Sequence, residues 1–197
     1  MTRLIYVLGL ALLLTSLANS AKADLIIDVV GAPGSGQTTW TLTGSDTSTS
    51  SGTFRSGSLA ETDSWMDIAD LFKTNISSFQ QAISGATVNV GGTAYAIDRI
   101  LIDDDGSNAS NVDDEIGFGV DNTSNVTFSA ATLISWTGSF TLGADINDMN
   151  VGSYQDPSPS FGGLDLRVNV SAVPEPSGTV LICFALASWN LRFRRTK

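Results

Sequence analysis

Residues 103–115 concentrate the side chains best suited to bind a hard metal ion. They hold six carboxylates and two amides within 13 residues. Proteins bind calcium through roughly six to eight oxygen ligands of this kind, and a bound cation relieves repulsion among unpaired acids. The candidate ligands are Asp103, Asp105, Asn108, Asp113, Asp114 and Glu115. The spacing does not fit an EF-hand, because Gly106 as the sixth position puts Leu101 first and Val112 twelfth. Composition alone therefore makes this a candidate calcium site, and a solvated acidic loop is the alternative.

The glycine-rich segment Gly31-Ala-Pro-Gly-Ser-Gly36-Gln37-Thr38 is a second chemical motif. It matches the phosphate-binding pattern G-x-x-x-x-G-K-S/T except at Gln37, where a lysine should reach the phosphates. A phosphate loop must also open a helix, whereas the residues after Thr38 alternate between β-branched and apolar types. The segment is therefore predicted to be a turn between two strands and not a nucleotide site.

Several kinds of catalytic and structural site are excluded because the chain has no histidine and one cysteine, Cys183. A Ser-His-Asp or Cys-His centre needs an imidazole, a structural zinc site needs sets of Cys and His, and a disulfide needs a cysteine pair. A glycoside hydrolase needs only two carboxylates, but no feature selects two of the many acids. The sequence therefore predicts a protein that is not an enzyme, with a hydrolase as the weakest alternative.

The charge of the chain is concentrated in its central part. The whole chain has 10 basic and 20 acidic residues, but only four basic residues and 19 acids lie between Asp24 and Val173. This balance of −15 opposes binding to phosphate backbones, which requires lysine and arginine. Nucleic acid is therefore excluded as a partner.

Both ends of the chain carry the features of membrane-targeting signals. Residues 1–23 have a basic start at Arg3, an apolar run and a small-residue end at Ala21-Lys22-Ala23, which predicts an export signal and a mature chain that begins at Asp24. Residues 173–197 contain Pro174, Glu175 and Pro176, an apolar stretch over residues 179–191, and a basic end with Arg192, Arg194 and Arg195. Positive charge after an apolar segment favours a cytoplasmic position for that end. The alternatives are an uncleaved N-terminal anchor and a C-terminal anchor that is never processed.

The C-terminal arrangement resembles a PEP-CTERM sorting tail, with the Pro174-Glu175-Pro176 motif, one hydrophobic segment and an arginine cluster in the family's order. The resemblance covers only residues 173–197. It implies a Gram-negative bacterium that makes exopolysaccharide, recognition by the membrane protease-transpeptidase called exosortase, and cleavage near the motif. The hydrophobic segment is shorter than the ~20 apolar residues of a typical span, so we expect a short hydrophobic helix that is inserted only transiently.

Residues 24–172 are predicted to form one all-β domain, either a sandwich or a jelly-roll-like fold. Ser and Thr make up 37 of the residues from Asp24 to Val173 and Gly another 17, which favours short strands joined by tight turns. Apolar residues alternate most clearly at Leu164, Leu166, Val168 and Val170. Gly91-Gly92 between two strand-like runs predicts a hairpin with a two-residue turn. Residues 45–57 are rich in Ser, Thr and Gly and are predicted to be a mobile loop.

One amphipathic helix is expected within this domain. Six apolar side chains within residues 65–83 follow one another at intervals of three or four residues, which places them on one face of a helix. They are Trp65, Ile68, Phe72, Ile76, Phe79 and Ile83. Ser64 and Asp67 form a suitable cap, and Gly85 is a suitable stop.

Two functions from different classes are compatible with these features. The first is a non-enzymatic protein of the cell surface or exopolysaccharide matrix, exported across the inner membrane and processed by exosortase. The second is a carbohydrate-binding module that stacks sugar rings on Trp40, Trp136, Tyr95 or Tyr154. The alternating positions of the two tryptophans are more typical of core residues.

Overall fold

The predicted all-β class is confirmed. The computed structural model of the chain describes residues 24–60, 65–68, 71–73, 79–104, 114–156 and 161–173. Within these ranges the secondary structure consists of eleven strands and one short 3-10 helix, η2 (Ile146–Asp148). The strands are β1 (Leu25–Gly31), β2 (Thr38–Thr47), β3 (Gly52–Ser56), β4 (Met66–Ile68), β5 (Phe79–Val90), β6 (Thr93–Asp104), β7 (Asp114–Val120), β8 (Val126–Phe128), β9 (Leu133–Leu142), β10 (Gly152–Gln155) and β11 (Leu166–Ala172). In the part of the chain that is described, no helix has the length and hydrophobicity needed to cross a bilayer.

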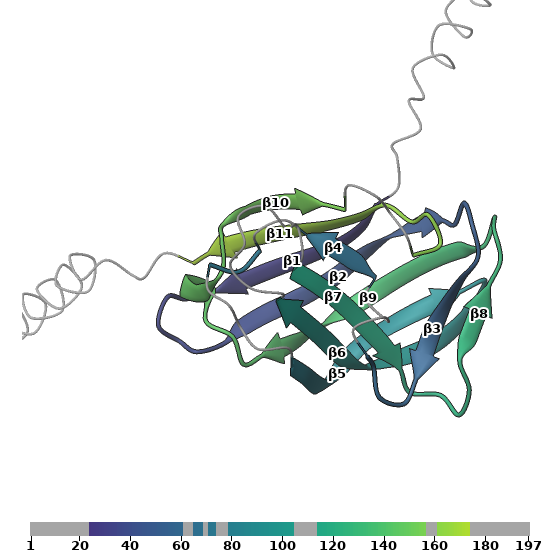
Figure 1. Ribbon diagram of the computed structural model, residues 1–197, viewed down its shortest axis with the longest axis horizontal. Coiled ribbons are helices and arrows are strands. Elements are labelled where there is room, and N and C mark those ends of the chain that lie inside the picture. The colour runs from purple at the N-terminus through teal and green to yellow at the C-terminus, as the bar shows by residue number, and fades with distance from the viewer. Residues whose placement is uncertain are drawn as a thin grey trace, which may run out of the picture.

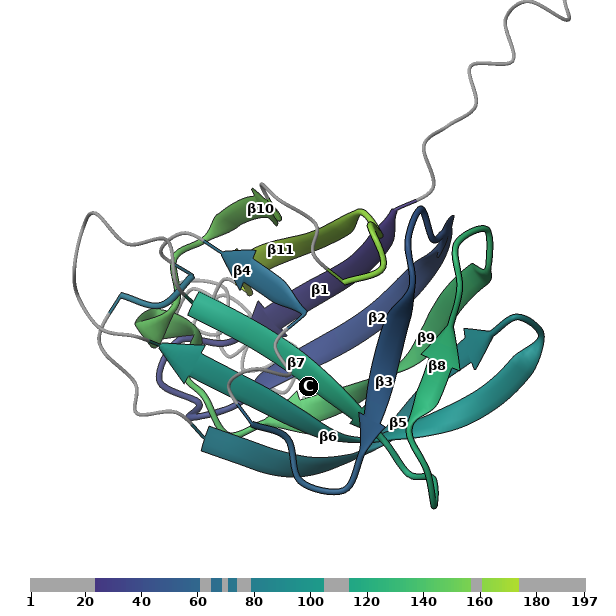
Figure 2. The ribbon, with the colours of Figure 1, turned by 45° about the vertical axis from the view of Figure 1, so that its right-hand side comes forward.

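The strands form one continuous sheet that curls over its own core. Ten of the described strands follow the order β10-β11-β1-β2-β9-β5-β6-β7-β3-β8, and β4 pairs with β7 beside this path. The β1–β11 and β3–β7 pairs are parallel, and the other pairs are antiparallel. Figures 1 and 2 show β6 and β7 lying across β1, β2 and β9, so that two parts of the same sheet face each other.

The hydrophobic core lies between these two parts. Phe118 of β7 contacts Trp136 and Phe140 of β9, with ring centroids 5.7 and 6.1 Å apart. In the sheet order β7 and β9 are separated by β5 and β6, so these contacts cross the core. Alternate residues are buried in several strands, as in β1, where Leu25, Ile27 and Val29 are buried and the residues between them are half-buried. This alternation explains why the Ser/Thr-rich sequence still supports a core.

A line of glycines allows the sheet to curl. Gly44, Gly138 and Gly85 have φ angles of 102°, 110° and 96° and belong to the neighbouring strands β2, β9 and β5. Glycine is required at position 138 for two reasons. A Cβ there would collide with the carbonyl oxygen of Gly85, and its positive φ disfavours other residues. The pairing register also shifts in β5, between Ala82 and Ala86. Irregularities of this kind bend strands and increase their twist.

The clearest local predictions from the sequence are confirmed. Leu164, Leu166, Val168 and Val170 are buried, and the last three belong to β11. The predicted hairpin is β5–β6, in which Val90 pairs with Thr93 across Gly91-Gly92. Both turn glycines have positive φ, and the amide of Gly92 donates a hydrogen bond to Asn89 Oδ1 at 2.8 Å. Alternation and turn chemistry therefore identified these elements correctly.

The predicted amphipathic helix over residues 65–83 is wrong. Met66–Ile68 forms β4 and pairs with β7, Phe72 bridges Met149, and Phe79 begins β5. Ile76 lies outside the described residues. Trp65, Ile68 and Phe72 are buried, and Phe79 and Ile83 are partly buried against the core. Ile68 belongs to β4, which pairs with the edge of β7, whereas Phe79 and Ile83 belong to β5. Spacing of three and four identified burial and misidentified the backbone conformation.

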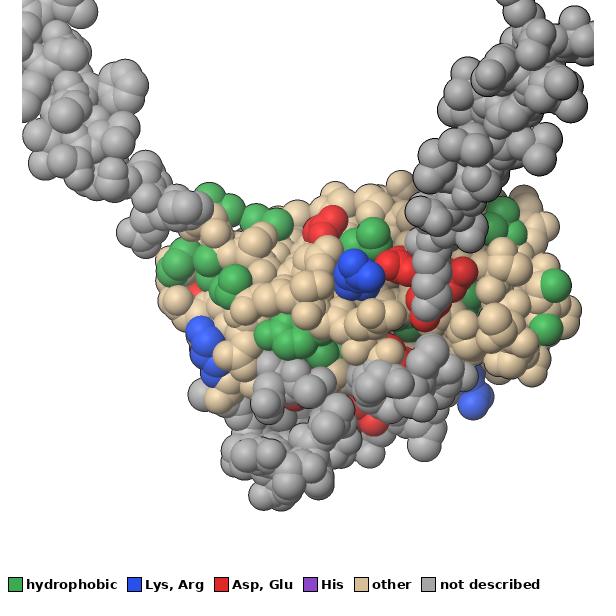
Figure 3. Space-filling model, turned by 90° about the horizontal axis from the view of Figure 1, so that it is seen from above, with side chains coloured by type: hydrophobic (Ala, Val, Ile, Leu, Met, Phe, Trp, Pro, Cys, Tyr) green, Lys and Arg blue, Asp and Glu red, His purple; other side chains and the backbone are tan. Residues whose placement is uncertain are grey.

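The predicted mobile loop over residues 45–57 is also wrong in extent. Residues up to Thr47 continue β2, and Gly52–Ser56 forms β3. Ser48, between them, is buried, and its hydroxyl donates to the carbonyl of Ser129 at 2.8 Å. On the face in Figure 3, most of the described surface is backbone or side chains that are neither charged nor hydrophobic, with small scattered groups of charged and hydrophobic side chains. Ser and Thr are thus used on strand surfaces as well as in turns.

Candidate functional site

The end of β11 is the point from which the predicted sorting tail leaves the domain. β11 ends at Ala172, and the amide of the next residue, Val173, donates a hydrogen bond to the carbonyl of Gly31 at 2.8 Å. This bond extends the parallel β1–β11 pairing by one residue. The side chain of Val173 is exposed, at 46 %. The predicted motif residues and membrane-stop arginines follow, and all lie outside the described residues: Pro174, Glu175, Pro176, Arg192, Arg194 and Arg195.

The other end of the same strand pair holds the predicted mature N-terminus. Leu25 begins β1, and its amide donates to the carbonyl of Asp165 at 2.9 Å. Asp24 forms an ion pair with Arg167 of β11, with 2.9 Å between the Arg167 Nη2 and Asp24 Oδ2 atoms. Because β1 and β11 run parallel, as Figure 1 shows, Asp24 and Val173 lie at opposite ends of the pair. The two predicted signals are therefore attached at opposite ends of the domain.

The glycine-rich segment between β1 and β2 is held by a carboxylate of the protein itself. Gly34 donates its amide hydrogen to Asp145 Oδ1 at 3.1 Å, and Gly36 donates to Asp145 Oδ2 at 2.8 Å. Gly34 and Gly36 have positive φ, the conformation in which successive amides form an anion-binding concavity. Asp145 also caps η2 by accepting from the amide of Asn147 at 2.8 Å. We refer to this arrangement of Gly34, Gly36 and Asp145 as the carboxylate clasp.

The clasp changes the acidity of Asp145 and explains the chemistry of the loop. Hydrogen bonds from the amides of Asn147, Gly36 and Gly34 lower the pKa of Asp145, and its limited burial opposes them. The amides that resemble a phosphate site therefore already have an anion. The turn connects two antiparallel strands, with Gly31 opposite Thr38, as predicted. Sequence reasoning could not find Asp145, because it lies more than one hundred residues from the loop.

The acidic segment is divided between described and undescribed residues. Asp103 and Asp114 are buried, Glu115 is half-buried, and Asp103 pairs with Glu115 across β6 and β7. Asp114 Oδ2 accepts the amide hydrogen of Phe72 at 2.7 Å, so this carboxylate holds the chain after β4. Asp105, Asn108 and Asp113 lie outside the described residues. Among the residues that are described, no three Cys, Asp or Glu side chains come together as metal ligands. The calcium site stays a prediction.

Two of the four aromatic residues considered for sugar stacking are buried in the core. Trp40 is 0 % and Trp136 3 % exposed, and their Nε1 atoms donate to Thr38 Oγ1 at 2.9 Å and to the carbonyl of Thr43 at 2.8 Å. A buried indole face cannot stack on a sugar ring. Tyr95 and Tyr154 are half-buried, and the Tyr154 hydroxyl donates to the carbonyl of Asn150 at 2.9 Å. The described structure offers no tryptophan platform at these two positions.

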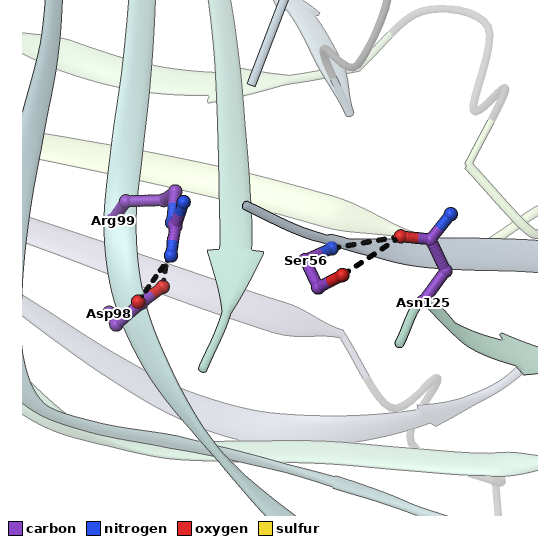
Figure 4. Close-up of polar contacts among 4 residues, drawn as sticks. All are labelled: Ser56, Asp98, Arg99 and Asn125. Carbon is purple, nitrogen blue, oxygen red and sulfur yellow. Dashed lines mark hydrogen bonds and ion pairs between the residues drawn. The ribbon is translucent and has the colours of Figure 1, made fainter. Parts of the chain in front are cut away.

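Figure 4 shows two polar pairs that sequence reasoning missed. Arg99 donates from Nε to Asp98 Oδ1 at 2.8 Å, and the hydrogen bond to Asp98 raises the pKa of Arg99. Asn125 Oδ1 accepts from the amide and the hydroxyl of Ser56, at 3.0 and 3.3 Å, which ties the end of β3 to the start of β8. The first pair joins adjacent residues of β6, and the second links β3 to β8.

No protein-family model, curated protein or solved structure matches this chain. The residues of this chain and their placement in the structure are therefore the basis for assigning its function.

Proposed function

We propose that this chain is a non-enzymatic, exported protein of the cell surface or exopolysaccharide matrix, and that an exosortase-like enzyme recognises and cleaves its C-terminal tail. The order of features in residues 173–197, with Pro174-Glu175-Pro176 before an apolar segment and an arginine cluster, carries the proposal. In support, β1 begins at Leu25 and β11 ends at Ala172, so the folded domain occupies the stretch between the two predicted signals.

The proposal includes the architecture of the domain. Two facing parts of one curled sheet are the support for a sandwich or jelly-roll-like scaffold. Such a domain, with its hydroxyl-rich strands, suits a stable component of a hydrated matrix. In the proposed reaction the domain performs no chemistry, and the enzyme supplies the nucleophile.

The test is processing in a Gram-negative host with the enzyme and in the same strain without it. We expect the enzyme-containing strain to release a shortened chain. Its intact mass should correspond to a chain that begins at Asp24 and ends near the motif. Glu175→Ala should leave an unprocessed chain in the inner membrane. Asp121→Ala, an exposed acid in the turn after β7, is the matched control and should be processed normally. Equal processing of the Glu175→Ala chain would contradict the proposal.

A second candidate function is glycan binding by a polar sheet face in place of aromatic platforms. One row of side chains runs across five neighbouring strands in register: Ser153, Asn169, Asp28, Thr41 and Ser139. Within it Ser153 Oγ donates to Asn169 Oδ1 at 2.8 Å, and Asn169 Nδ2 donates to Asp28 Oδ1 at 2.9 Å. Hydroxyl and amide groups can hydrogen-bond to sugar hydroxyls. Co-sedimentation with the host exopolysaccharide, weakened by Thr41→Val and unaffected by Thr127→Val on β8, would favour this function. Binding that is equal in both variants would exclude the row.

A further inference from the structure

The sorting motif begins without any spacer after the folded sheet. Val173 is hydrogen-bonded to Gly31 at 2.8 Å, and Pro174 is the next residue. Residues up to Ala172 are paired with β1 in parallel register, with Ala172 opposite Gly31. The residues just before the motif are thus part of the sheet.

On the β1 side, this placement prevents an enzyme from binding the residues before the motif as an extended strand. An enzyme that binds its substrate as a strand makes backbone hydrogen bonds to several consecutive residues. Ala172 and Val173 can offer their backbone to an enzyme on the β1 side only after they have separated from β1. Such local opening costs free energy, and its population sets how often the bound form can be reached.

The carboxylate clasp stabilises the strand end to which Val173 is attached. Gly31 is the last residue of β1 and the first residue of the glycine-rich segment, and it is buried. A Cβ on Gly31 would lie 3.0 Å from Ile146 Cβ, so Gly31 packs directly against the residue that follows Asp145. Asp145 then fixes the other side of the loop through Gly34 and Gly36, at 3.1 and 2.8 Å. Loss of these two hydrogen bonds would loosen the loop and Gly31. The carbonyl of Gly31, which accepts the hydrogen bond from the Val173 amide, would then be held less firmly.

We propose that Asp145 is a positioning residue for tail processing: the clasp keeps Val173 in the sheet and thereby limits access of the processing enzyme to the adjacent motif. This inference rests on the proposed function. It adds that the folded domain regulates the rate of its own sorting, through a residue distant from the motif in sequence.

The experiment compares four full-length chains in membranes that contain the processing enzyme. They are the wild type, Asp145→Asn, a chain with Gly-Ser-Gly-Ser inserted between Val173 and Pro174, and a chain with both changes. We expect Asp145→Asn and the insertion each to raise the initial cleavage rate several-fold. The combined chain should be cleaved no faster than the insertion alone, because the spacer already frees the motif from the sheet.

Two further measurements separate this role from a general effect on stability. Hydrogen exchange of the full-length chain in detergent should accelerate more at Val173, Gly34 and Gly36 than in the β5–β6 hairpin in Asp145→Asn. Asp148→Asn removes one carboxylate charge from η2, the 3-10 helix that Asp145 caps. Asp148 is exposed, so this substitution should change neither exchange nor cleavage.

The possible results distinguish the two proposals. If Glu175→Ala blocks cleavage but the spacer and Asp145→Asn leave the rate unchanged, the clasp has no role in processing and the proposed function stands. If the effects of the spacer and of Asp145→Asn multiply in the combined chain, the two act separately and the clasp proposal is overturned. If the wild type is not cleaved in any strain, both proposals fail.

Discussion

Asp145 shows how one side chain can determine the character of a motif. The glycine-rich segment has the spacing of a phosphate loop, but its amides at Gly34 and Gly36 donate to this carboxylate. An anion supplied by the protein itself satisfies donors that would otherwise attract phosphate. Both the glutamine at position 37, in place of lysine, and the carboxylate of Asp145 therefore oppose phosphate binding by this segment.

The lowered pKa of Asp145 predicts a pH-dependent contribution to stability. A carboxylate whose pKa is lower in the folded state stabilises the fold at pH values above its unfolded pKa, for which the reference value is 3.8. This contribution is lost as the pH falls through the lower, folded pKa. Asp145→Asn should therefore lower the thermal midpoint at neutral pH, and the difference from wild type should shrink in the acid range. Thermal unfolding from neutral to strongly acidic pH measures this, and a difference that is constant with pH would contradict it.

The acidic segment makes a separate prediction at the residue scale. If its carboxylates bind calcium, added calcium should raise the thermal midpoint, because a ligand that binds only the folded state stabilises it. Asp105→Asn should reduce this shift, since Asp105 is one of the predicted ligands. Asp121→Asn, in the exposed turn after β7, is the control and should retain the shift. A thermal midpoint that does not change when calcium is added would favour the alternative, a solvated acidic loop.

At the scale of elements, irregularities in the strands explain features that regular strands would not permit. Asp98 and Arg99 are neighbours in β6 and would normally point to opposite faces. The register against β7 shifts between Ile97 and Arg99, and such a bulge redirects a side chain. Asp98 and Arg99 can then form their ion pair between adjacent residues. Both side chains are partly exposed, so the pair contributes at most about 1 kcal/mol.

The glycine line across β2, β9 and β5 predicts a strong effect of a small substitution. Gly138→Ala places a Cβ against the Gly85 carbonyl and forces alanine into a φ of 110°, so it should reduce the free energy of unfolding by more than about 2 kcal/mol. Gly92→Ala is a matched control, because its φ is also positive but no atom lies within 4 Å of the added Cβ. It should cost only about 1 kcal/mol. Urea unfolding of both variants measures the difference, and equal losses would show that the close approach at Gly138 has no energetic effect.

At the scale of the whole molecule, stability depends on contact between the two facing parts of the sheet. Phe118→Ala removes a fully buried ring that contacts two aromatic residues of β9. We expect a loss of about 3 to 5 kcal/mol in the free energy of unfolding. Leu133→Ala, which truncates a side chain that is 56 % exposed, should change it by less than about 0.5 kcal/mol. Urea unfolding at neutral pH checks both values, and a small effect at Phe118 would contradict the facing arrangement.

The sequence by itself determined the features that depend on composition and local pattern. The absence of histidine and the single cysteine excluded whole classes of site, and the order of residues at both ends predicted export and processing. Alternation of apolar residues identified β11, and Gly91-Gly92 identified the β5–β6 turn. The predictions of β11 and of the β5–β6 turn are confirmed, because side-chain alternation and turn conformation are set by residues close together in the chain. Export and processing stay predictions.

Only the tertiary structure decided which distant segments meet. The apolar spacing of residues 65–83 suits a helix, but Met66–Ile68 pairs with β7 as β4 and Phe79 begins β5. The parallel pairing of β1 with β11 joined the first and last strands, and the fold brought Asp145 to Gly34 and Gly36. These contacts join segments that are far apart in the sequence, and no local periodicity predicts them. They are determined by the free energy of the whole fold, which outweighs local conformational preference.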